Sequence, residues 1–179
     1  MNGIEQLCPR CGLCCDSTLF ADVELRAGDD AQQLARLGLT VQPKTKAKLA
    51  FAQPCACFDG RWCKIYADRP QRCRLFACGL LKRVERGEMT AGAALKKIAQ
   101  ARARAAQVRE LLDQSGPRDD RGRAVPAPWH DEQMALTHRY AAVMSAPVDL
   151  SVEGEAEQRG KLMLAVNDLM QMLERDFLR

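Results

Sequence analysis

The feature that most constrains this chain is a set of nine cysteines, all of which lie before Gly79 in a sequence of 179 residues. In a C-x2-C loop, two thiols and several backbone N–H groups can point toward one ion or cluster. Four cysteines form one run and five come later in the chain: Cys8, Cys11, Cys14 and Cys15, then Cys55, Cys57, Cys63, Cys73 and Cys78. The run cannot complete the coordination alone, so the sequence predicts a metal site built from two distant segments.

The setting of these thiols favours metal binding over disulfides. No apolar segment approaches the ~20 residues that span a bilayer, and the N-terminus lacks the pattern of a signal peptide. We therefore expect a cytoplasmic protein with no membrane segment. Cytoplasmic thiols are kept reduced, so a dense and odd-numbered cysteine set is expected to bind metal rather than to form a disulfide framework.

The adjacency of Cys14 and Cys15 indicates more than one metal atom, because neighbouring side chains usually point to opposite sides of the backbone. The spacing leaves three assemblies open. These are two zinc sites of four thiolates each, one iron–sulfur cluster held by Cys8, Cys11, Cys14 and a remote thiolate, or a cluster plus a zinc. Cys57 makes an odd ninth, and we interpret it as a spare thiol or a swap ligand rather than an obligatory ligand.

The fold class expected from the sequence is mainly α. An aromatic content of 5% is low for a large β core, and the apolar spacing of the second half is helical. We expect a cysteine-rich, metal-binding N-terminal half with short extended segments, followed by a helical hairpin or small bundle. The cysteine-cluster region is placed at residues 1–88 and the helical region at 89–179, packed on it or appended, with an exposed linker at about 115–128.

In the first half, short extended segments are expected at 22–25, 39–42 and 49–52. Asp29-Asp30 opens a helix over 31–37 that Gly38 ends. Asp59-Gly60 is a turn signal and predicts a tight loop between Cys57 and Cys63.

Pro70 is well placed as the first residue of a helix that reaches Arg86, because proline lacks an N–H that this position does not need. Cys73 and Cys78 are five residues apart, which separates them by about 140° on a continuous helix. Either the helix breaks near Cys78-Gly79 or the two thiols serve different centres.

The second half shows longer helical patterns. The segment from Thr90 to Gln114 predicts one helix with a narrow seam of apolar, mostly small residues: Ala94, Ile98, Ala101, Ala105, Val108 and Leu112. This seam is either an intrachain contact or the contact of a homodimer. Further helices are expected at 131–145 and at about 151–178, the last with one apolar face that Met163 and Met170 widen: Leu162, Val166, Leu169, Leu173 and Phe177.

The charge pattern favours a solvated surface over a nucleic-acid site. The formal net charge is only +4, and no aromatic residues alternate with the basic residues of the long helix. Those residues flank the seam rather than forming one face: Lys96, Lys97, Arg102, Arg104 and Arg109. The sequence identifies no physiological partner beyond a protein partner or a second copy of the chain.

Other residues receive individual interpretations. Arg69 is read as a donor to sulfur or a counter-charge for thiolates. Trp62 is placed to keep water away from the metal. A helix could bring His130, Met134 and His138 to one face, but without a cysteine or carboxylate pair in register we interpret them as core or surface residues.

The cysteine pattern, together with the residues around it, resembles that of the YkgJ-type cysteine-cluster proteins, whose signature is a CxxCxxCC run and whose domain is described as zinc- or iron-chelating. The shared positions are Cys8, Cys11, Cys14, Cys15, Pro54-Cys55, Cys63-Lys64-Ile65-Tyr66, Arg69-Pro70, Cys73-Arg74-Leu75-Phe76 and Cys78. The resemblance covers residues from about 5 to 85. It implies metal chelation by the eight matching cysteines and leaves Cys57 outside the pattern.

The cluster is also similar to that of the flagellin lysine methylases, which implies an alternative as a protein methyltransferase or a cluster-dependent redox enzyme. Those proteins are much longer. The chain has no Gly-rich turn after a clear strand, no P-loop and no Ser/His/Asp signature. The sequence therefore favours a metal-binding protein of zinc or iron over an enzyme.

Overall fold

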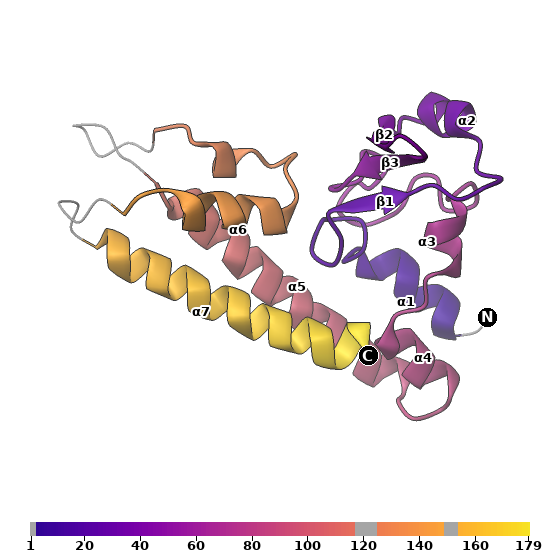
Figure 1. Ribbon diagram of the computed structural model, residues 1–179. Coiled ribbons are helices and arrows are strands. Elements are labelled where there is room, and N and C mark those ends of the chain that lie inside the picture. The colour runs from indigo at the N-terminus through magenta and orange to yellow at the C-terminus, as the bar shows by residue number, and fades with distance from the viewer. Residues whose placement is uncertain (1–2, 117–124, 149–153) are drawn as a thin grey trace.

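The computed structural model describes residues 3–116, 125–148 and 154–179, and the side chains from Leu7 onward within them. The fold is mainly α with one small sheet, which confirms the expected class (Figure 1). In chain order the elements are α1 (Gly3–Cys11), β1 (Asp22–Glu24), α2 (Ala31–Arg36), β2 (Val41–Thr45), β3 (Lys48–Ala52), α3 (Gln71–Leu75), α4 (Gly79–Glu85), α5 (Ala91–Gln114), a 3-10 turn (Pro128–His130), α6 (Leu136–Ser145), α7 (Glu155–Leu173) and a π-helical end (Glu174–Leu178).

The sheet is antiparallel, with β3 between β1 and β2. Together with α2 it encloses a small core that includes Val23, Leu34, Phe51 and Ile65. The expected segments at 22–25 and 49–52 are therefore strands, whereas β2 begins two residues later than expected. Leu39 is instead buried in the turn that closes α2, where its N–H donates to the carbonyl of Leu34 at 3.1 Å.

The predicted helix at 31–37 is confirmed as α2. The side chain of Asp30 accepts a hydrogen bond from the N–H of Gln33 and caps the first turn. Gly38 follows the helix with φ +101°, a left-handed conformation that glycine adopts without the strain a side chain would cause. The signals for both ends of this helix are local, which is why the sequence predicts them correctly.

The continuous helix expected from Pro70 to Arg86 is wrong, because the chain is extended between α3 and α4. Pro70 precedes α3 as its N-cap, and Phe76 ends α3 with φ −75° and ψ 116°. Cys78 then caps α4, accepting a hydrogen bond on Sγ from the N–H of Leu81 at 3.4 Å. The break lies at the place that the positions of the two cysteines suggested.

Helices α5 and α7 lie side by side and run in opposite directions (Figure 1). The predicted seam is buried throughout, with exposed fractions between 0% and 5%: Ala94, Ile98, Ala101, Ala105, Val108 and Leu112. It packs in one core with the apolar face of α7 and with Leu7, Leu13 and Leu80 of the cysteine-bearing half. The seam is thus an intrachain contact, and the homodimer interface considered for it is wrong because these side chains already have partners within the chain.

The later helices differ from expectation at their ends. The helix expected at 131–145 begins at Leu136, because the Asp131 side chain accepts from Gln133 N in a turn and Ser17 Oγ accepts from Leu136 N at 3.1 Å. On α7 the expected apolar face is buried, but Met163 and Met170 are 48% and 62% exposed and do not widen it.

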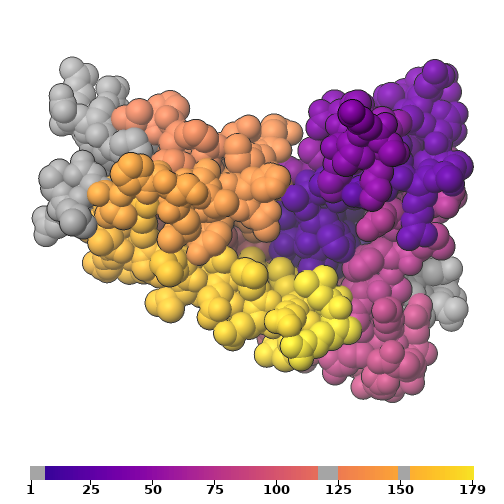
Figure 2. Space-filling model, viewed as in Figure 1, coloured from indigo at the N-terminus to yellow at the C-terminus, as the bar shows by residue number. Residues whose placement is uncertain are grey.

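The linker expected at 115–128 falls partly outside the described residues, which resume at 125. Its first residue, Ser115, is buried rather than exposed, and its carbonyl accepts from Trp129 Nε1 at 2.9 Å. In the described ranges no helix is both long enough and apolar enough to cross a membrane. Figure 2 shows a notch between the purple lobe that holds the sheet and the orange lobe that holds α6.

The close approach of α5 and its neighbours predicts the effect of a larger side chain in the seam. Ala105→Leu adds three carbons at a fully buried position and should lower the free energy of unfolding by about 1–3 kcal/mol through overpacking. Urea denaturation measures the change. Ala106→Leu, on the exposed face of the same helix, is the control, and equal stability of the two variants would contradict the assigned packing.

Candidate metal centre

The first cysteine run lies on α1 and the turn that follows it. Cys8 and Cys11 are three residues apart on the helix and therefore share one face. Gly12, with φ +73°, ends the helix, and its carbonyl accepts from the N–H groups of Cys15 and Asp16 at 2.7 and 2.9 Å. This turn brings Cys14 and Cys15 back toward the helix. The sequence did not predict α1, because Cys8-Pro9-Arg10-Cys11-Gly12 has the composition of a turn.

The second set of cysteines comes from separate elements that close around the first. Cys55 follows β3, and its N–H donates to the Cys15 carbonyl at 2.8 Å, which joins the two segments directly. Cys63 lies opposite Phe58 in an isolated antiparallel bridge. Cys73 is on α3 and Cys78 caps α4, so the break between these helices separates the last two thiols.

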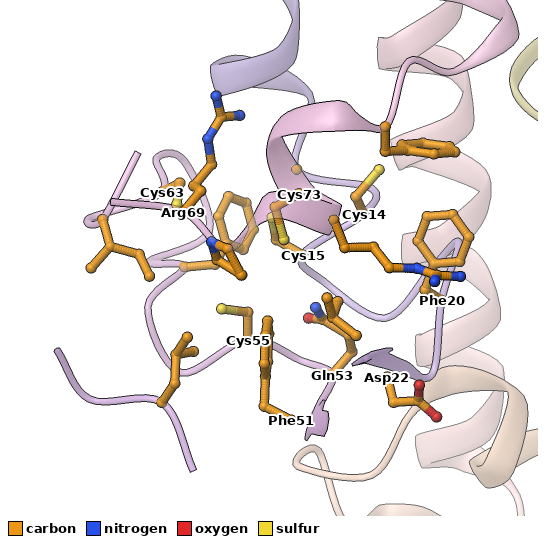
Figure 3. A pocket seen from close by; sticks show the side chains of 18 of the residues that line it. Cys14, Cys15, Phe20, Asp22, Phe51, Gln53, Cys55, Cys63, Arg69 and Cys73 are labelled. Atoms are coloured by element: carbon orange, nitrogen blue, oxygen red, sulfur yellow. The ribbon is translucent and has the colours of Figure 1, made fainter. Parts of the chain in front are cut away.

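The eight family-pattern cysteines border two adjoining cavities, three of them only the larger cavity and two only the smaller. A cavity of about 400 Å³ is lined by Cys15, Cys55, Cys63 and Cys73, here called the Cys73 group. A cavity of about 60 Å³ is lined by Cys8, Cys11, Cys14 and Cys78, here called the Cys78 group. Three residues of the run, Cys8, Cys14 and Cys15, border both cavities. Figure 3 shows the larger cavity, with the members of the Cys73 group around it and Cys14 nearby.

The electrostatics of Cys11 and Cys73 follow the same grouping, while Cys8 also raises the pKa of Cys63 across the two groups. Burial raises the pKa of Cys11 to about 12, and repulsion from Cys78 and Cys8 adds to it. Burial also raises the pKa of Cys73 to about 12, with added repulsion from Cys55 and Cys63. These two thiolates are thus disfavoured by lost hydration and by other members of their own group. A cation among the thiols removes both penalties, so metal binding would release protons.

The donor set fits zinc or iron. Four thiolates complete a tetrahedral zinc site, and four also hold a common iron–sulfur cluster. The thiols border common cavities but do not yet surround a single point. In the part of the chain that the structure describes, no three Cys, His, Asp or Glu side chains are placed to hold one ion. A metal would therefore draw together thiols that already border one cavity.

Cys57 lies outside both groups and borders neither cavity. Its side chain is buried, at 3% exposed, and Sγ donates a hydrogen bond to the carbonyl of Leu37 at 3.2 Å. The ninth cysteine thus packs under the end of α2, as a small buried residue of the second core does.

Two arginines of α5 hold the cysteine-bearing loops, a role that the sequence did not indicate. Arg102 donates to the carbonyls of Arg10 and Gly60 at 3.1 and 3.0 Å. Arg109 donates to the Asp16 carbonyl at 2.8 Å and to the Thr18 hydroxyl at 3.0 Å. The seven-residue spacing of the two arginines places them on one face of α5, which is the only local signal for this shared role.

Other predicted site residues have simpler positions. Arg69 stacks on the ring of Tyr66 at 3.5 Å and borders the larger cavity, where its charge counteracts the raised pKa of Cys63 and Cys73. Trp62 is 49% exposed and does not cover the thiols. The common face of His130, Met134 and His138 does not form, because residues 131–135 are not helical. His130 instead bonds the Ser115 carbonyl at 2.8 Å.

One protein family matches the chain over residues 7–103, which is more than half of its length. That family is CxxCxxCC, described as "Putative zinc- or iron-chelating domain". The chain belongs to this family, and the resemblance recognised from the cysteine pattern is confirmed. The match continues past the cysteines into α5 and ends one residue beyond Arg102. No curated protein and no solved structure matches the chain.

The turn at Gly12 predicts a sharp sensitivity to any side chain. A Cβ at Gly12 would lie 2.3 Å from Cζ of Phe58, in addition to the strain of a positive φ. Gly60 has a similar φ of +89° but open space around it. Gly60→Ala should cost roughly 1–2 kcal/mol of stability from the backbone alone. Gly12→Ala should cost more and reduce the bound metal, as thermal melting and elemental analysis would show; equal losses would contradict the Phe58 contact.

The arginine contacts predict a coupling between α5 and the cysteine loops. Arg109→Ala removes charged hydrogen bonds to Asp16 and Thr18 and should cost about 1.5–3 kcal/mol. Hydrogen exchange at residues 12–19 should rise. Arg104→Ala is the control, because its partner Asp168 is 60% exposed and the pair should contribute at most about 1 kcal/mol. Faster exchange in both variants would contradict a specific contribution of Arg109 to the cysteine loops.

Proposed function

We propose that the protein binds zinc or iron at two adjacent centres of four thiolates each. One centre uses the Cys78 group, which is Cys8, Cys11, Cys14 and Cys78. The other uses the Cys73 group, which is Cys15, Cys55, Cys63 and Cys73. The observation that carries the proposal is that Cys55, Cys63 and Cys73 border only the larger cavity, whereas Cys11 and Cys78 border only the smaller one.

The division also explains why the run contains adjacent cysteines. Cys14 and Cys15 belong to different groups, as expected for neighbouring side chains that point to opposite sides of the backbone. A single ion would leave four of the eight thiols without a metal. Two centres use all eight and leave only Cys57, which already has a hydrogen-bond partner in Leu37.

The chemistry of the site suits a protein that keeps its metal in a reducing compartment such as the cytoplasm. When bound, zinc would supply structural cross-links, and iron–sulfur clusters would supply electron transfer. The residues of this chain hold the two segments together through the Cys55–Cys15 backbone hydrogen bond and place the Arg69 charge beside the Cys73 group.

Single cysteine replacements test the division into two centres. Cys73→Ser and Cys78→Ser should each remove the metal of one centre, leaving about half of the wild-type content. Cys57→Ala is the matched control and should retain all of it. Metal is measured by elemental analysis of anaerobically purified protein. If Cys57→Ala loses as much metal as the other two variants, or if every variant retains all of it, the assignment of ligands is wrong.

Removal of the metal should unfold the cysteine-bearing half before the helical half. Structural zinc with thiolate ligands contributes on the order of 10 kcal/mol in small domains, whereas α5 and α7 are held by apolar packing. After treatment with a chelator, limited proteolysis should cut first within residues 12–78, with part of the helical circular dichroism retained. An unchanged proteolysis pattern after proven loss of metal would contradict a structural role.

A further inference from the structure

The larger cavity is lined by aromatic rings as well as by thiols. Its walls include the rings of Phe20, Phe51, Phe58 and Phe76, and Phe20 meets Phe76 edge to face with centroids 5.0 Å apart. A volume of about 400 Å³ lies in the range of sites that bind small molecules, and such sites combine apolar walls with a few placed polar groups.

One of those polar groups has no partner. Gln53 borders the cavity and is only 2% exposed, and its backbone N–H donates to the Ala21 carbonyl at 2.9 Å. Its side-chain oxygen Oε1 is buried and, among the described residues, accepts no hydrogen bond. Figure 3 shows this side chain at the cavity between Phe51 and the thiols of Cys15 and Cys73. A buried acceptor without a donor is costly, so an N–H or O–H of a bound molecule would satisfy it.

The charges around the cavity favour a neutral ligand. Lys44 pairs with Asp22 and Glu24 at 2.8 and 3.1 Å, and Lys48 pairs with Glu24 at 2.9 Å, so two lysines neutralise the two acidic lining residues. In the described ranges no carboxylate pairs with the other two cationic lining residues, Arg69 and Arg72. Four thiolates of the Cys73 group around a divalent ion would carry two net negative charges, which balance these two arginines. The cavity beside that centre therefore offers no net charge to an ionic ligand.

From these observations we infer that the cavity beside the Cys73 group binds a small, neutral, mainly aromatic or apolar molecule whose N–H or O–H donates to Gln53 Oε1. The molecule would contact the phenylalanine rings with its apolar body. This site goes beyond metal binding, and it would place an organic ligand directly against one of the two proposed centres.

The test uses the full chain as purified, with its metal content recorded, and indole as the probe, because indole combines an aromatic body with a single N–H donor. Binding is measured by calorimetry and by ligand-observed NMR. Indole should bind at least about ten-fold more tightly than 1-methylindole, which has the same ring without the donor. Cationic tryptamine should bind more weakly than indole.

Variants then assign the contact. Gln53→Leu should remove the preference for indole over 1-methylindole, whereas Gln107→Leu, on the exposed face of α5, should leave it unchanged. Equal affinity of the wild-type protein for the two indoles, absence of binding, or tighter binding of tryptamine would overturn the inference without any variant. Donor-dependent binding by protein that proves to hold no metal would sustain this site and contradict the proposed function.

Discussion

Thiols that are both buried and close together resist ionisation, and this constraint governs the cysteine-bearing half of the molecule. Loss of hydration raises the pKa of Cys11, Cys15 and Cys73, and neighbouring thiolates raise it further. Such an arrangement is stable as neutral thiols or as thiolates around a cation, and only the second uses the convergence of segments that lie up to seventy residues apart. The metal is thus the expected centre of a region that has only a small apolar core of its own.

The rest of the chain supports this region through packing and hydrogen bonds. Helix α5 is buried along its seam, and the cysteine loops are attached to it by Arg102 and Arg109. The far end of the chain contributes as well, because the carbonyl of Arg179 approaches Gly79, next to Cys78, so closely that a Cβ there would lie 1.9 Å from it. The helical half therefore serves as a platform on which the second cysteine segment is held against the first.

Patterns that depend on neighbouring residues could be predicted from the sequence, and contacts between distant residues could not. The cap of α2 at Asp30 and the seam of α5 are local signals, and the structure confirms both. The start of α6 could not be predicted, since it depends on Ser17, 119 residues away. The cysteine spacing predicted a two-part site with more than one metal atom. The partition into groups depends on the break before Cys78 and on the three-dimensional path of the chain.

The central claim is that the eight cysteines form two centres rather than one or none. Elemental analysis of anaerobically purified protein, combined with its absorption spectrum and the sulfide content, tests this most directly. We expect either about two zinc ions per chain and no visible colour, or iron with inorganic sulfide in amounts that require two clusters and absorption in the visible range. Folded protein that holds a single mononuclear ion, or that neither contains nor takes up zinc or iron, would contradict the account.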